Sequence, residues 1–254
     1  MNKEEPIKTG IDIIDERIEG FYPGELTVIQ NSYGYLYLAK MIINIVRHSE
    51  TLHIPFFLFL LGLLENDIIK LALGCTNDIF SFDIVKKELN DGLLELLLCD
   101  NMFVKSKTKL PLEDLCTHIK EKVSQNKNID IIFIDDFYQI SISENKEISE
   151  TEDVLKTISS FKELAVQLNI PIVINCCWFH DANKTPVEEL SRMIEAYADI
   201  IIDTQRDSGS RYSPAAITVC RNHKETPINY PLIYDRIKED LFEPNITQSE
   251  LEKI

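Results

Sequence analysis

The chain has 254 residues, of which 44% are hydrophobic and 27% are charged, values of an ordinary globular protein and not of a disordered one. Its 26 basic and 42 acidic side chains give a net charge of −16. This charge disfavours nucleic acid as a partner, because affinity for phosphate backbones rests largely on Lys and Arg.

The sequence contains no segment typical of a membrane span or a secretory signal. Its longest apolar run, Ile54–Leu64, is far shorter than the ~20 residues needed to cross a bilayer. The first ten residues lack the apolar core of a signal peptide. The six cysteines form no C-x-x-C pair, which favours a reducing compartment over a disulfide framework or a zinc site. We therefore expect a cytoplasmic protein without membrane contact.

Strand-like and helix-like segments alternate along the chain. The first half predicts three strands and two amphipathic helices, in the order Glu25–Gln30, helix Leu38–Val46, Pro55–Leu61, helix Glu65–Leu73 and Leu96–Cys99. The second half predicts two further helices and five strands, in the order helix Leu112–Val123, Ile129–Ile134, helix Thr151–Leu168, Pro171–Cys176, Asp199–Asp203, Ala216–Cys220 and Pro231–Tyr234.

This alternation predicts an α/β fold. Apolar strands joined by amphipathic helices form right-handed crossovers, which give a mostly parallel central sheet flanked by helices on both faces. We expect a single domain over residues 1–254, with flexible ends at residues 1–8 and 244–254.

Two segments follow predicted strands where such sheets bind ligands, at the carboxyl ends. The first is Asn31–Leu38, with the sequence NSYGYLYL. The second is the pair Asp135 and Asp136, which directly follows the strand Ile129–Ile134. In nucleotide-hydrolysing proteins a carboxylate at this place lies beside magnesium. The pair either contacts a metal in this way or is a strand end inherited from an ATPase ancestor that no longer binds one.

Ten further short segments between Lys8 and Glu243 follow one another in an order that is typical of one protein family. They are Thr9–Asp15, Gly20–Leu26, Ile132–Asp135, Phe161–Ala165, Ile170–Ile174, Ile194–Glu195, Ala198–Ile201, Arg206–Asp207, Ala216–Val219 and Asp240–Glu243. Together they resemble the RecA-like ATPase domain of hexameric replicative DNA helicases of the DnaB type. The resemblance implies a RecA-like P-loop NTPase fold, with Ile132–Asp135 as the Walker B strand and a role in DNA replication.

The phosphate-binding loop departs from that family. A Walker A loop reads G-x-x-x-x-G-K-[ST], because its backbone amides, lysine and hydroxyl hold the phosphates and magnesium. Here Gly34 is the one glycine, and Tyr37 or Leu38 stands at the lysine position. Tyr33, Tyr35 and Tyr37 are bulky enough to fill the volume of a triphosphate. We therefore predict a degenerate Walker A loop.

Other positions implied by the resemblance also lack the family's groups. The glutamate that orients the attacking water corresponds to Gly62 or Leu63, and the glutamine that senses the γ-phosphate corresponds to Cys177 or a neighbour. The basic pair that reaches the next subunit's site corresponds to Arg221 and roughly His223. Because an arginine finger alone contributes on the order of 10³–10⁵ in rate, losing several such groups predicts essentially no turnover.

The predicted site is therefore a vestigial nucleotide-binding site without catalytic or metal-binding residues. Its members are Asn31, Ser32, Tyr33, Gly34, Tyr35, Tyr37, Asp135, Asp136 and Arg221. In this family the loop after the Walker B strand lines the DNA channel, but here Ser143–Asp153 carries five acids and one lysine.

Three hypotheses remain open at this point. The first is a non-hydrolysing pseudo-ATPase that needs no cofactor and acts through a protein partner or self-association. The second is an ATP-dependent DNA helicase or recombination-type ATPase that uses Mg-ATP and binds single-stranded DNA. The third binds nucleotide without hydrolysis, with the loop tyrosines stacking on a base. A shared fold does not decide among them.

Overall fold

A computed structural model gives the architecture of a large part of the chain. It describes residues 5–9, 12–31, 56–60, 102–104, 110–125, 129–134, 137, 140–141, 150–177, 193–206, 212–221, 228–235 and 240–242. Within these ranges lies a nine-stranded sheet with the order β11-β10-β9-β8-β1-β7-β5-β2-β3. A second sheet of two short strands, β4 (Leu110–Pro111) and β6 (Ile140–Ser141), lies beside it.

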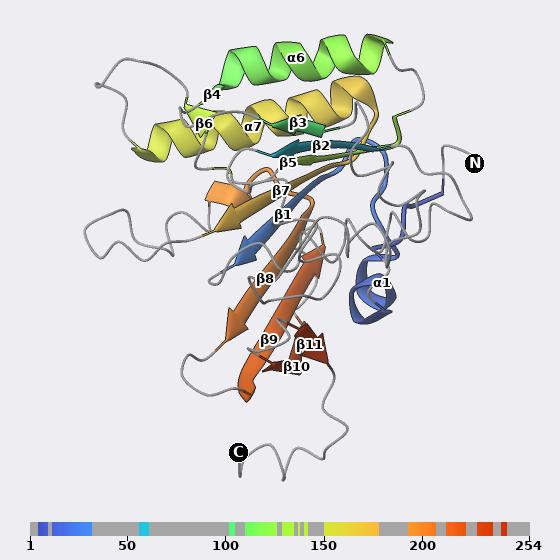
Figure 1. The fold of residues 1–254 in the computed structure, drawn as a ribbon, viewed down its shortest axis with the longest axis vertical. Coiled ribbons are helices and arrows are strands. Elements are labelled where there is room, and N and C mark those ends of the chain that lie inside the picture. The colour runs from blue at the N-terminus through green and yellow to red at the C-terminus, as the bar shows by residue number, and fades with distance from the viewer. Residues whose placement is uncertain are drawn as a thin grey trace, which may run out of the picture.

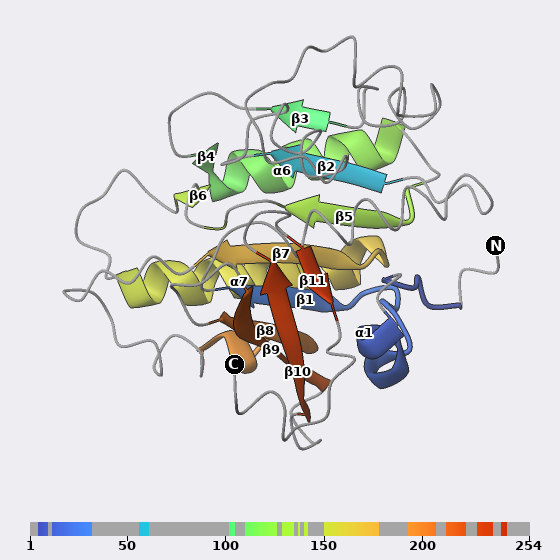
Figure 2. The same cartoon turned by 60° about the horizontal axis from the view of Figure 1, so that its bottom comes forward.

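The main sheet has a parallel part and an antiparallel part (Figures 1 and 2). The parallel strands are β1 (Leu26–Asn31), β2 (Phe56–Leu60), β3 (Met102–Val104), β5 (Ile131–Ile134), β7 (Ile172–Cys177) and β8 (Ile200–Arg206). The antiparallel strands are β9 (Tyr212–Arg221), β10 (Ile228–Asp235) and β11 (Asp240–Phe242). The prediction of a mostly parallel α/β sheet is confirmed.

Two long helices, α6 (Leu112–Gln125) and α7 (Glu150–Leu168), lie together over one face of the sheet (Figure 1). The short helix α1 (Asp12–Ile18) contacts β9 instead. Acidic residues begin α6, where they complement the partial positive charge of the helix N-terminus. Both long helices agree with their predicted segments to within two residues.

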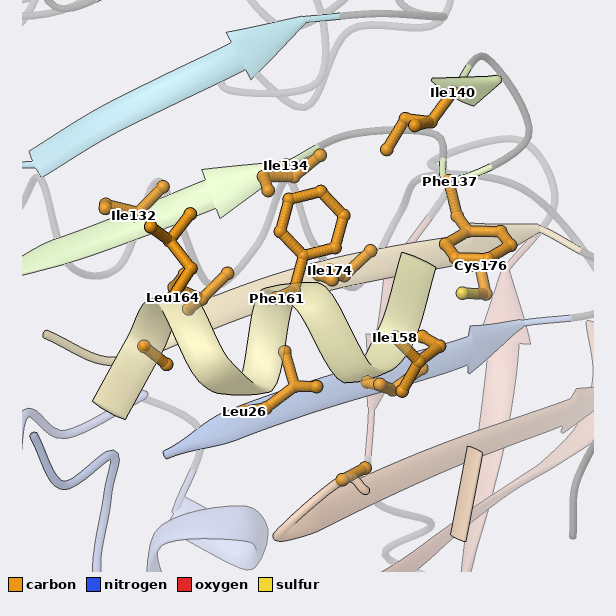
Figure 3. Close-up of a cluster of buried hydrophobic side chains, with 14 of the residues drawn as sticks. Leu26, Ile132, Ile134, Phe137, Ile140, Ile158, Phe161, Leu164, Ile174 and Cys176 are labelled. Carbon is orange, nitrogen blue, oxygen red and sulfur yellow. The ribbon is translucent and has the colours of Figure 1, made fainter. Parts of the chain in front are cut away.

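The core beneath α7 is built from alternate residues of neighbouring strands (Figure 3). Phe161 of α7 is fully buried and packs with Leu26, Ile132, Ile134 and Ile174 in one hydrophobic cluster. The intervening residues of β1 and β7 are fully buried as well, so the strands are enclosed on both faces. This explains why these strands read as continuous apolar runs in the sequence.

The last three strands run antiparallel, which the alternation of elements did not predict. Only residues 207–211 separate β8 from β9, and residues 222–227 separate β9 from β10. These connections are shorter than the dozen or more residues that a parallel crossover requires, so the chain must turn back on itself.

Several predicted elements lie outside the described residues, namely the helices Leu38–Val46 and Glu65–Leu73 and the strand Leu96–Cys99. Conversely, the structure contains α1, β3, β4, β6 and β11, which the sequence pattern did not predict. Each of these has seven residues or fewer, too short for a clear periodic pattern.

The amino-terminal segment is tied to the turn before β1. Ile7 and Phe21 form an antiparallel bridge, with N–H to O distances of 2.9 and 2.8 Å. Thr9 donates its backbone N–H to the Asp15 carboxylate of α1 at 2.8 Å. Gly20 has φ +112°, and a Cβ there would lie 2.6 Å from the Ile7 carbonyl oxygen, so this close approach requires glycine.

Truncating Phe161 tests the core described above. We expect Phe161→Ala to lower the free energy of unfolding by about 3–5 kcal/mol, because it leaves a cavity between α7 and the sheet. The measurement is urea denaturation followed by circular dichroism. Val166→Ala is the control, since Val166 lies on the same helix and is 58% exposed. Comparable losses in the two variants would contradict the described packing.

Gly20→Ala tests the amino-terminal bridge. The added methyl collides with the Ile7 carbonyl, and the backbone conformation is unfavourable for alanine, so we expect a lower melting temperature. Gly24→Ala has the same type of backbone penalty at φ +79°, but its Cβ would meet nothing nearer than 3.7 Å. A loss in Gly20→Ala no greater than that in Gly24→Ala would show that the bridge does not constrain this site.

Candidate functional site

The two halves of the predicted site follow strands that end at the same edge of the sheet, the carboxyl edge. Asn31, the last residue of β1, pairs with Cys177 on one side and Thr204 on the other. Ile134, the last residue of β5, pairs with Ile174. The acidic pair Asp135 and Asp136 follows Ile134 in the chain, just as the tyrosine-rich loop follows Asn31.

These strand ends are offset from each other. The strand β7 lies between β1 and β5, so the two ends are separated by two strand spacings, about 10 Å. Ile174 also pairs with Val28, which places the end of β5 three residues, or about 10 Å, short of Asn31. β1 and β7 therefore project beyond β5 at this edge.

The register separates Arg221 from this edge. Arg221 pairs with Ile200, the first residue of β8, whereas Asn31 pairs with Thr204 of the same strand. The two backbone positions thus differ by about 13 Å along the strand direction. Within one chain, Arg221 and the end of β1 lie towards opposite edges of the sheet.

Ser32, Tyr33, Gly34, Tyr35, Tyr37, Asp135 and Asp136 lie outside the described residues, and Asn31 and Arg221 are placed by their backbone alone.

Buried polar side chains near the carboxyl edge were not singled out from the sequence. Gln30 of β1 is 6% exposed, and Asn175 of β7 is fully buried. Asn175 interrupts the otherwise apolar run PIVINC, so the sequence alone could have indicated a buried polar residue at this position. Gln30 and Asn175 both have interaction partners.

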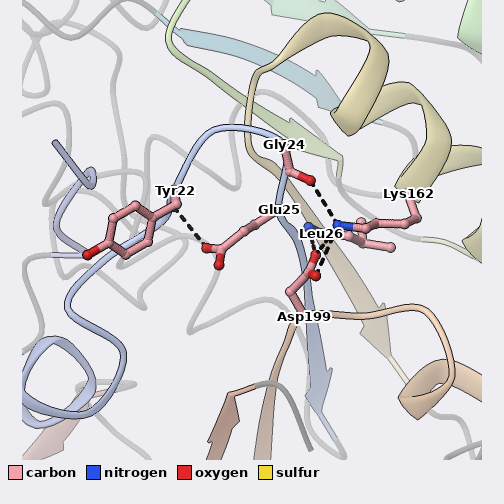
Figure 4. Close-up of polar contacts among 6 residues, drawn as sticks. All are labelled: Tyr22, Gly24, Glu25, Leu26, Lys162 and Asp199. Carbon is pink, nitrogen blue, oxygen red and sulfur yellow. Dashed lines mark hydrogen bonds and ion pairs between the residues drawn. The ribbon is translucent and has the colours of Figure 1, made fainter. Parts of the chain in front are cut away.

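The polar cluster best defined in the structure lies at the opposite, amino edge (Figure 4). Lys162 of α7 donates from Nζ to both carboxylate oxygens of Asp199, at 3.0 and 2.7 Å, and to the Gly24 carbonyl at 2.9 Å. Asp199 Oδ2 also accepts the Leu26 N–H at 2.7 Å, and the Asp199 N–H donates to the Leu26 carbonyl at 2.9 Å. The cluster joins α7, the start of β1 and the residue before β8.

The turn before β1 is fixed by neighbouring bonds. Tyr22 donates its backbone N–H to the Glu25 carboxylate at 2.9 Å, and the Glu25 N–H donates back to the Tyr22 carbonyl at 3.2 Å. The Glu25 carbonyl accepts the Ile172 N–H at 2.9 Å, which connects the turn to β7. Among the described residues, these bonds make the start of β1 and the turn before it a structural support.

Metal and thiol chemistry find no support in the described ranges. No three His, Cys, Asp or Glu side chains within those ranges gather in a way that could hold a metal ion. Burial raises the pKa of the Cys116 thiol, an effect that nearby Lys120 only partly opposes, so this cysteine stays protonated at neutral pH. Among the helices that the structure describes, none has the length and apolar character of a membrane span.

The mostly parallel sheet is that of the α/β proteins that bind their ligands at the carboxyl ends of the strands. Residues 6–228 match the family described as the DnaB-like helicase C terminal domain, so the chain belongs to that family. No curated protein matches the sequence.

Solved structures share the fold at low sequence identity. One is an ATPase domain, with a TM-score of 0.71 and 13% identity, and the match covers 94% of this chain and 92% of that one. Another is a DnaB-like replicative helicase studied for its interactions with primase, with a TM-score of 0.70 and 13% identity. This chain spans 63% of that helicase and is itself covered to 94%.

Removing the lysine tests the amino-edge cluster. Lys162→Met leaves the Asp199 carboxylate and the Gly24 carbonyl without their ammonium donor. We expect a loss of about 1–2 kcal/mol in the free energy of unfolding, which is less than for a fully buried pair because the two side chains are 27% and 21% exposed. Lys156→Met, an exposed position on the same helix, is the control. Equal unfolding midpoints for the two variants would show that the ion pair contributes nothing.

Proposed function

We propose that this DnaB-like domain does not hydrolyse nucleotide and acts through protein contacts. The observation that carries the proposal is the sequence of the loop after β1, NSYGYLYL, which has no lysine, serine or threonine at the end of the loop. Without them, the negative charge of a triphosphate has no cation opposite it, and magnesium has no hydroxyl ligand from this loop.

The frame that would position such a loop supports the same proposal. β1 pairs with β7 from Leu26 to Asn31 and with β8 from Thr27 to Asn31. The change relative to an active site therefore concerns side-chain chemistry and not the course of the strand. Tyr33, Tyr35 and Tyr37 supply bulk and apolar surface where phosphates need backbone amides and positive charge.

The residues present do not provide a complete site for Mg-ATP. Asp135 and Asp136 are suitable oxygen donors for magnesium. Arg221 retains a charge that suits a phosphate, but its backbone lies towards the other edge of the sheet. The acidic pair would hold the metal and the loop would have to hold the phosphates, and the loop lacks the groups to do so. We therefore propose that the domain uses no cofactor.

Protein is the partner class that the charge favours. The net charge of −16 and the five acids of Ser143–Asp153 oppose binding to a phosphate backbone. The structure related to this one at a TM-score of 0.70 is described with its interactions with primase, a protein. We propose a protein partner, or a second copy of this chain, in the cytoplasm.

An ATP-dependent helicase or recombination-type ATPase is the second candidate, favoured by the family match and by Asp135 and Asp136. It requires ATP turnover stimulated by single-stranded DNA, and DNA binding that weakens as salt is raised. A third candidate binds nucleotide without turnover, through stacking on the loop tyrosines. It requires binding that is lost in Tyr35→Ala and that tolerates different numbers of phosphates.

Calorimetric titration with Mg-ATP separates these candidates. We expect no saturable heat with up to millimolar nucleotide, because the loop offers no cation to the phosphates. As a matched comparison, Tyr37→Lys with Leu38→Ser restores the lysine and hydroxyl in one alignment, and Leu38→Lys with Ala39→Ser restores them in the other. Gain of binding in one of these variants would identify the missing groups as the cause.

Saturable binding of Mg-ATP at micromolar concentration by the unaltered chain would contradict the proposal. A hydrolysis assay with and without single-stranded DNA would then decide between the second and third candidates. Loss of that binding in Tyr35→Ala without any turnover would favour the third.

A further inference from the structure

We draw no further inference here: the strongest candidate, the exposed apolar side chains of Val166 on α7 and Tyr197 before β8 at the amino edge of the sheet, carries none because nothing among the described residues shows what covers them.

Discussion

The structure depends on how the first strand is seated in the middle of the sheet. β1 contacts β7 on one side and β8 on the other, and its start is held by Asp199, which bonds both the Leu26 backbone and the Lys162 ammonium. Because β1 has a fixed length and a fixed register with its neighbours, holding Leu26 in place also fixes the position of Asn31. The cluster at the amino edge therefore helps to determine where β1 ends at the carboxyl edge.

This arrangement separates support from chemistry. The amino edge contains the turn before β1, the bridge between Ile7 and Phe21 and the Lys162–Asp199 pair, all satisfied by internal bonds. The carboxyl edge is where the family places its phosphate-binding loop, and its loop sequence can change without altering the register below. A domain of this family can therefore lose the residues for hydrolysis while keeping the DnaB-like fold that the match over residues 6–228 and the solved structures reveal.

The fold could be predicted from the sequence mainly because several of its strands are buried on both faces. The segments of β1, β5 and β7 were predicted to within two residues, because an enclosed strand is an unbroken apolar run. The direction of β9–β11 was not predictable from periodicity, which is the same for parallel and antiparallel strands. The Lys162–Asp199 contact joins residues 37 apart, and nothing in either local segment marks it.

The order of strands in space also sets an order in time. The chain is made from its amino end, yet β1 has no partner among the strands described until Ile172–Cys177 and Ile200–Arg206 have been made. At roughly 5–20 residues per second, the ribosome needs on the order of ten seconds or more to deliver β7 after β1. β8, β9 and β10 instead pair with strands that follow immediately. During synthesis the centre of the sheet is thus an apolar strand that is made early and gains its described partners late.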